Sequence, residues 1–208
     1  MKHFRTPTLA ILAGACLSLL GTNALAESTY GYNAAGTGVV TANARLNLVI
    51  NVPKLILLRV GSSGATVDTL TWNSGLTWAT APGTLTNGNN QATNWDGAAP
   101  TAATTNPADV SAFAWTNNSG GGSLVYAATP FGAGGPALGD ITVTSAATSA
   151  PGLAHPAPSP LVAVSTGATF FARNTLATGT WSFALGGTPT AWTAGQYTSQ
   201  ITYTATSL

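Results

Sequence analysis

The chain has 208 residues and few charges, which excludes several classes of function. Only 5% of the residues are Asp, Glu, Lys or Arg, and the formal net charge is +1, whereas about a quarter of the residues are charged in an ordinary soluble domain. Such a chain has neither the basic surface that binds nucleic acid nor a polybasic patch for anionic lipid. The mean hydropathy of +0.24 also excludes a charged, disordered tail. We therefore expect no nucleic-acid partner.

The first residues are organised like a bacterial secretory signal peptide. A basic start, Lys2 to Arg5, precedes an apolar stretch at residues 9–20. Ala24-Leu25-Ala26 then places small residues where signal peptidase cleaves. The apolar run is too short for the roughly 30 Å hydrocarbon core of a bilayer, and no later run is long and apolar enough. We predict cleavage after Ala26, no transmembrane segment, and export to the periplasm, the outer surface or the medium.

The only cysteine of the chain, Cys16, lies inside this leader. Gly14-Ala15-Cys16 resembles the end of a bacterial lipobox, the motif that directs lipid attachment to a cysteine, but Ala13 stands where that motif prefers Leu. We favour cleavage after Ala26 over lipidation at Cys16. The mature chain is then cysteine-free, so we expect neither a disulfide nor a cysteine-based metal site.

The clearest pattern after the leader is an alternation from Val40 to Val52. Positions are polar and apolar in turn, and Val49 is the one apolar residue on the polar side. The apolar positions are Val40, Ala42, Ala44, Leu46, Leu48, Ile50 and Val52. A period of two over this length predicts a strand with one buried face. Residues 27–52 are then either the first strand of their own domain or an extension that pairs with another chain.

The rest of the chain predicts short strands between turns. Lys54–Val60 is apolar on both faces, which is typical of a central strand. Further strands are expected at Thr66–Trp72, Leu76–Thr80, Val110–Thr116, Ser123–Thr129, Asp140–Ser145, Leu161–Thr166, Thr169–Arg173, Gly179–Leu185 and Gln196–Thr206. The spacers are rich in Gly, Asn, Pro and Ser, and no window has the period of an amphipathic helix. We predict one all-β domain, an antiparallel immunoglobulin-like β-sandwich at residues 27–208, with a Pro-rich crossover loop at 151–160.

Few residues after the leader carry catalytic chemistry. His155 is the only histidine there, and it has no acidic neighbour in the Pro-rich segment, so we expect a solvated loop residue rather than a general base. The carboxylates are scattered and form neither a glycosidase pair nor a calcium loop. Gly132–Gly135 leads into Pro136 and not into a helix, which argues against a phosphate loop. We predict a protein that is not an enzyme and holds no metal or cofactor.

The six tryptophans suit the core of a sandwich, because each buries a large apolar area. Trp95 differs, since Asn94 and Asp96 flank it in an Asn-rich turn. A flat apolar ring beside amide and carboxylate groups can stack on a sugar. A glycan contact at Trp95, Asn94 and Asp96 is therefore our second hypothesis, in which the protein is a monomeric surface binding module.

The C-terminal strand points to a different class of protein. Residues 194–203 read AGQYTSQITY, and this stretch resembles the ending of spore coat protein U-like and chaperone–usher fimbrial subunits, a Gly-x-Tyr turn followed by an alternating strand. The positions that carry the resemblance are Gly195, Tyr197, Ile201 and Tyr203. Those subunits often have a disulfide and a penultimate tyrosine, whereas this chain ends Ser207-Leu208.

The resemblance implies donor-strand complementation. In that process an incomplete immunoglobulin-like sandwich is completed by the N-terminal extension of the next subunit, a form of β-strand addition. By this analogy the residues that fill the acceptor are Ala44, Leu46, Leu48 and Ile50. Our first hypothesis is a secreted or cell-surface structural subunit, fimbria- or coat-like, whose partners are copies of itself, related subunits and a periplasmic assembly chaperone.

Overall fold

The computed structural model describes residues 27–78 and 85–208. They fall into two units, residues 27–52, named the arm below, and Pro53–Leu208. The predicted leader at residues 1–26 and the end of the predicted strand Leu76–Thr80 lie outside the described residues.

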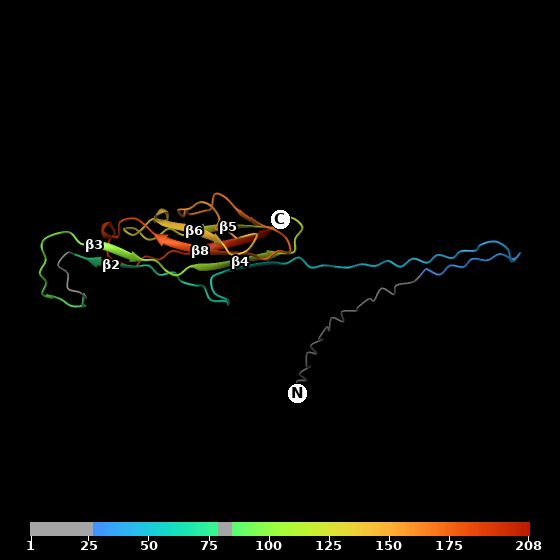
Figure 1. Ribbon diagram of the computed structural model, residues 1–208, viewed down its shortest axis with the longest axis horizontal. Helices are drawn as coiled ribbons and strands as arrows, with labels where there is room; N and C mark the ends of the chain where they lie inside the picture. Colours follow the sequence, from blue (N-terminus) through green and yellow to red (C-terminus); the bar gives the residue numbers. More distant parts are fainter. Residues whose placement is uncertain (1–26, 79–84) are drawn as a thin grey trace, which may run out of the picture. The chain divides into compact units, whose positions relative to one another are not determined.

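The unit from Pro53 to Leu208 is built of antiparallel sheets (Figure 1). One sheet has the order β1-β4-β8-β6, a second has the order β7-β5-β9, and β2 pairs with β3. The strands are β1 (Ile56–Val60), β2 (Asn73–Thr77), β3 (Thr101–Thr105), β4 (Val110–Thr116), β5 (Gly122–Ala128), β6 (Ile141–Ala147), β7 (Thr169–Phe171), β8 (Ala177–Leu185) and β9 (Ile201–Ser207). Only two short 3-10 helices, Leu138–Asp140 and Pro189–Ala191, accompany them in the described part. The fold is nearly all-β, as the sequence predicts.

The two larger sheets share one apolar core. Alternate residues of β4, β5 and β8 are buried, which is the expected result of period-two patterning on strands with one inner face. Trp181 of β8 and Tyr126 of β5 are at most 1% exposed. The Trp181 ring lies 5.2 Å from the ring of Tyr203 on β9, measured between centroids. Side chains from both sheets therefore meet in an arrangement consistent with a β-sandwich.

The Pro-rich crossover segment is part of this core. Leu153 is fully buried, its amide donates to Thr178 O at 2.9 Å, and its carbonyl accepts a hydrogen bond from Trp181 Nε1 at 2.9 Å. The His155 ring lies 5.0 Å from the rings of both Tyr126 and Trp181. The prediction that His155 is solvated is therefore wrong. The physical reason is a partner distant in sequence, because Tyr203 Oη lies 2.9 Å from His155 Nε2 and lowers the cost of burying the imidazole.

The half-buried position of His155 predicts a loss of stability in mild acid. Burial lowers the pKa of His155 to about 4 from its ordinary 6.5, and a backbone hydrogen bond at Pro156 opposes this only in part. As the pH falls through 6.5, the unfolded chain takes up a proton that the folded chain does not. We expect the free energy of unfolding to fall by about 2 kcal/mol between pH 7 and pH 5, measured by urea denaturation.

His155→Gln is the control for this loss, because glutamine keeps a hydrogen-bonding group but does not titrate. Its unfolding free energy should stay nearly constant between pH 7 and pH 5, where exposed carboxylates remain ionised. An equal fall in the variant and the parent would contradict the assignment to His155.

The strand predictions are confirmed where alternate residues are buried, and several are wrong where the side chains are mostly exposed. Val110–Thr116 is confirmed as β4, whereas β3, a run of Thr and Ala, was not predicted. No strand is formed at Thr66–Trp72, and Leu161–Thr166 makes only an isolated bridge to β5. The predicted central strand Lys54–Val60 is an edge strand, because β1 pairs only with β4. The outward-facing Leu57 lies opposite Trp115 on β4. This apolar cross-strand pair explains why β1 is apolar on both faces although it is an edge strand.

Candidate functional site

The arm reverses its direction at a tight turn. The amide of Gly36 donates to Asn33 O at 3.1 Å, and the amide of Ala35 donates to Asn33 Oδ1 at 2.9 Å. Gly36 adopts a φ of +65°, in the left-handed region that glycine enters without a Cβ clash. The two halves of the arm then run alongside each other as a thin ribbon (Figure 1).

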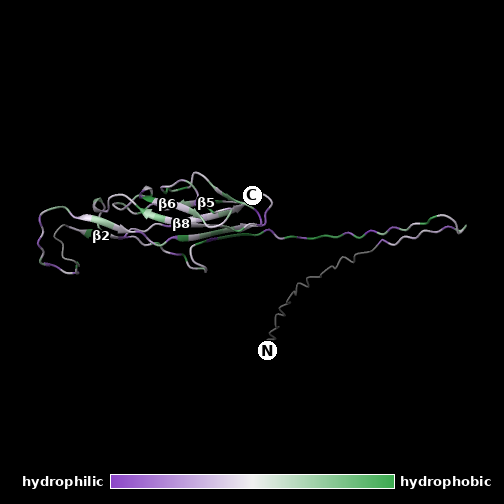
Figure 2. Ribbon diagram, viewed as in Figure 1, coloured by the Kyte–Doolittle hydropathy of each residue, from purple (hydrophilic) through white to green (hydrophobic). Residues whose placement is uncertain are grey.

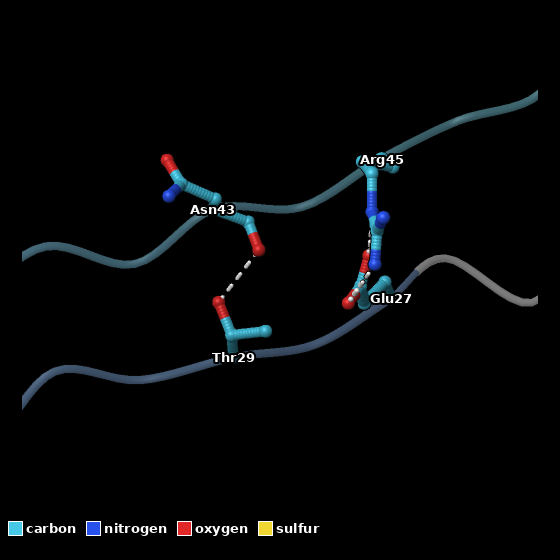
Figure 3. Close-up of polar contacts among 4 residues, drawn as sticks. All are labelled: Glu27, Thr29, Asn43 and Arg45. Atoms are coloured by element: carbon cyan, nitrogen blue, oxygen red, sulfur yellow. Dashed lines mark hydrogen bonds and ion pairs between the residues drawn. The ribbon is translucent and has the colours of Figure 1, made fainter.

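Three contacts across the ribbon share one register (Figure 3). Arg45 Nε and Nη2 donate to the Glu27 carboxylate at 2.8 and 3.0 Å. Thr29 Oγ1 donates to Asn43 O at 2.8 Å. A Cβ at Gly31 would lie 2.8 Å from Thr41 O, so only glycine allows this approach. The Arg45 guanidinium lowers the pKa of the Glu27 carboxyl through its hydrogen bonds. Residues 27–31 thus face 41–45, which sequence reasoning missed because Glu27 and Arg45 lie far apart in the chain.

The apolar side of the alternation is exposed. Leu46, Leu48 and Ile50 are 64, 83 and 85% exposed, and Ala44 is exposed as well. Figure 2 shows green, hydrophobic stretches in the part of the arm that precedes Pro53. No strand is assigned within residues 27–52. A contiguous apolar stripe of this kind is rare on a monomer and is typical of an interaction surface.

A side-chain amide holds the chain just after the arm. Asn117 Nδ2 donates to Pro53 O at 2.7 Å, and Asn117 Oδ1 accepts from the amide of Leu55 at 2.8 Å. Thr116 Oγ1 donates to Leu55 O at 2.8 Å. These contacts extend the β1–β4 ladder by using side chains in place of backbone groups. They fix residues 53–55 at the root of the arm, and no pattern in the sequence indicates them.

The core is less covered along β1 and β9 than at its centre. Each is the last strand of its sheet, and the two strands lie against each other. Their inward side chains are only half-buried, although they pack on the core, and they are Ile56, Leu58, Val60, Ile201, Tyr203 and Ala205. In the unit from Pro53 to Leu208, β9 forms a ladder only with β5. Among the described residues, one backbone edge of β9 therefore has no ladder partner, and half-buried apolar side chains lie beside it.

Three of the four C-terminal positions that carry the resemblance, Tyr197, Ile201 and Tyr203, make packing contacts in this fold. The Tyr197 ring packs against Gly135, and its hydroxyl donates to Thr193 O at 2.5 Å, while Gly195 is exposed. Ile201 and Tyr203 point toward the core from β9. Burial, assisted by the nearby Tyr126, raises the pKa of Tyr203, so this phenol stays neutral.

Trp95 lies in the long connection between β2 and β3 and is 60% exposed. Its Nε1 donates to Ala98 O at 2.7 Å, and Asp96 Oδ1 accepts from the amide of Ala98 at 2.9 Å. Asn94 precedes the ring in the chain. The local turn thus orients the indole while the ring stays accessible.

The described residues contain no gathering of three or more His, Cys, Asp or Glu that could hold a metal ion. They also contain no helix with the length and apolarity needed to cross a membrane.

Comparison with known proteins adds no relative. No protein-family model matches the sequence, no curated protein matches it, and no solved structure matches the fold. The protein is a nearly all-β protein with antiparallel sheets.

Proposed function

We propose that this protein is a secreted or cell-surface structural subunit without enzymatic activity, which assembles by donating a strand of its arm to another copy. An immunoglobulin-like sandwich of the fimbrial or coat type is the architecture we propose for it. The observation that carries the proposal is the exposed apolar stripe of Leu46, Leu48 and Ile50. It alternates with polar residues at the period of a strand, so one face could be buried while the other remains in water.

The open edge of β9 in a second copy is the acceptor we propose. The half-buried Ile201 and Tyr203 mark its inner face, and its outer face carries exposed threonines such as Thr204. A donated strand matches both faces, because the apolar side of the arm would cover the core and Asn47 and Asn51 would extend the polar surface. Backbone hydrogen bonds along the edge supply affinity, and side-chain complementarity supplies specificity.

The apolar gain is large enough to drive association. Burying Leu46, Leu48 and Ile50 contributes roughly 5–9 kcal/mol before costs, at about 1.5–3 kcal/mol for each side chain. Ordering the arm and losing translational freedom offset part of this gain. The net free energy of association also includes the backbone hydrogen bonds formed between the donated strand and β9.

The exposed ring of Trp95 favours a second candidate function, a monomeric module that binds glycans. The indole is oriented by its bond to Ala98 O and presents a flat apolar surface on which a sugar can stack. In that case the arm would have no role in association.

The test is the solution mass of the exported protein across a concentration series, with electron microscopy of the same fractions. We expect an intact mass that corresponds to cleavage after Ala26, together with oligomers or thin filaments. Deletion of residues 27–52 should abolish assembly because it removes the donated strand. A parent that stays monomeric at every concentration would overturn the proposal, and a glycan screen with Trp95→Ala as control would then follow.

A further inference from the structure

The alternation in the arm is longer than the edge that we propose it meets. It covers thirteen residues, Val40–Val52, whereas β9 has seven, Ile201–Ser207. A slip of one residue would turn the apolar face outward, but a slip of two residues keeps it inward. The hydrophobic pattern therefore selects the face and leaves several registers possible.

The ribbon divides this alternation into two parts. Residues 27–31 cover one edge of residues 41–45 through the Glu27–Arg45 ion pair, the Thr29–Asn43 hydrogen bond and the approach of Gly31 to Thr41. In the register of these contacts, Leu46 follows the residue that faces Glu27, and Glu27 is the first residue of the chain after the cleavage that we propose. In the cleaved chain the first half of the arm therefore leaves the same edge uncovered from Leu46 to Val52, which is seven residues and equals the length of β9.

We propose that residues 27–31 act as a register stop, so that the arm donates Leu46–Val52 and no more. This inference rests on the proposed strand donation and on the proposed cleavage after Ala26. The β9 strand of a second copy occupies the uncovered edge and ends against Glu27, because two strands cannot occupy the same stretch of one edge. The equal lengths favour this edge over the opposite one, where the described residues of the arm offer no such boundary.

Full overlap of the two seven-residue segments also matches their faces. Whether the strands run parallel or antiparallel, the central residue Val49 then lies opposite the outward Thr204. In both directions Leu48 and Ile50 lie on the inner face with Tyr203 and Ala205. Val49 is thus the position that reports the register.

Cross-linking between two differently labelled chains tests the register. The acceptor chain carries Thr204→Cys, and donor chains carry Asn47→Cys, Val49→Cys or Asn51→Cys. In an exported chain without its leader these are the only thiols. We expect the Val49→Cys donor to give the dominant disulfide, quantified by mass spectrometry of the covalent dimer.

Removing the contacts between residues 27–31 and 41–45 should allow a second register, in which Asn47 lies opposite Thr204. Arg45→Gln in the donor should raise the Asn47→Cys cross-link about two- to fivefold, the range for loss of an exposed ion pair. Removal of residues 27–31 should raise it further. The charge swap Glu27→Arg with Arg45→Glu should restore the single register, and Arg173→Gln, which removes an exposed arginine outside the arm, should leave it unchanged.

The outcomes separate this inference from the function on which it rests. A dominant Val49→Cys cross-link that persists after removal of residues 27–31 would overturn the register stop and leave strand donation standing. Absence of a cross-link from all three donors would overturn donation to β9 itself.

Discussion

Replacing Leu46 and Leu48 together with aspartate is expected to abolish assembly while the unit from Pro53 to Leu208 keeps its fold. Both side chains are largely exposed in the single chain, so the change removes little packing there. In the assembled state each carboxylate would be buried beside half-buried apolar groups without a partner, which costs several kcal/mol. We expect the association constant to fall by at least about 100-fold, measured by light scattering and electron microscopy.

The matched control introduces the same charge on the opposite face of the same segment. Asn47→Asp with Asn51→Asp adds two carboxylates that stay in water, so assembly should be weakened little. Circular dichroism and thermal unfolding should be alike in both double variants. Filaments or oligomers formed by the Leu46, Leu48 variant as readily as by the parent would contradict burial of these residues.

Trp181→Ala is expected to cause the largest loss of folding stability. Trp181 is fully buried, its Nε1 donates to Leu153 O, and its ring contacts His155 and Tyr203. Truncation leaves a cavity where strands and crossover segment meet, and the Leu153 carbonyl loses its donor. We expect the free energy of unfolding to fall by about 3–5 kcal/mol, measured by chemical denaturation.

Trp95→Ala provides the comparison for this loss, because the same substitution is made at a ring that is 60% exposed. Its effect should stay within about 1 kcal/mol, as is usual for surface positions. If the two variants unfolded at the same denaturant concentration, Trp181 would not have the central role in the core that its burial indicates.

Local patterns in the sequence were enough to predict the strands that have one buried face. Alternating apolar residues predict strand β4, Val110–Thr116, and strand β9 near the C-terminus. They do so because successive side chains of a strand point to opposite faces, which is a local property of the backbone. The same reasoning identified the apolar stripe of the arm, including Leu46 and Leu48. The sequence pattern could not predict that this stripe is exposed, because exposure depends on which other parts of the chain pack beside it.

Only the tertiary structure decided the features that depend on distant partners. The apolar outer face of β1 at Leu57 suggests a central strand, but Trp115 supplies the neighbour and β1 lies at an edge. His155 is half-buried beside Tyr203, with which it shares a hydrogen bond, and residues 53–55 are held by Asn117. Such contacts join residues far apart in the chain, and local periodicity carries no information about them. The sequence by itself thus determined an all-β chain with an alternating apolar segment, while non-local contacts decided which edges and faces are open.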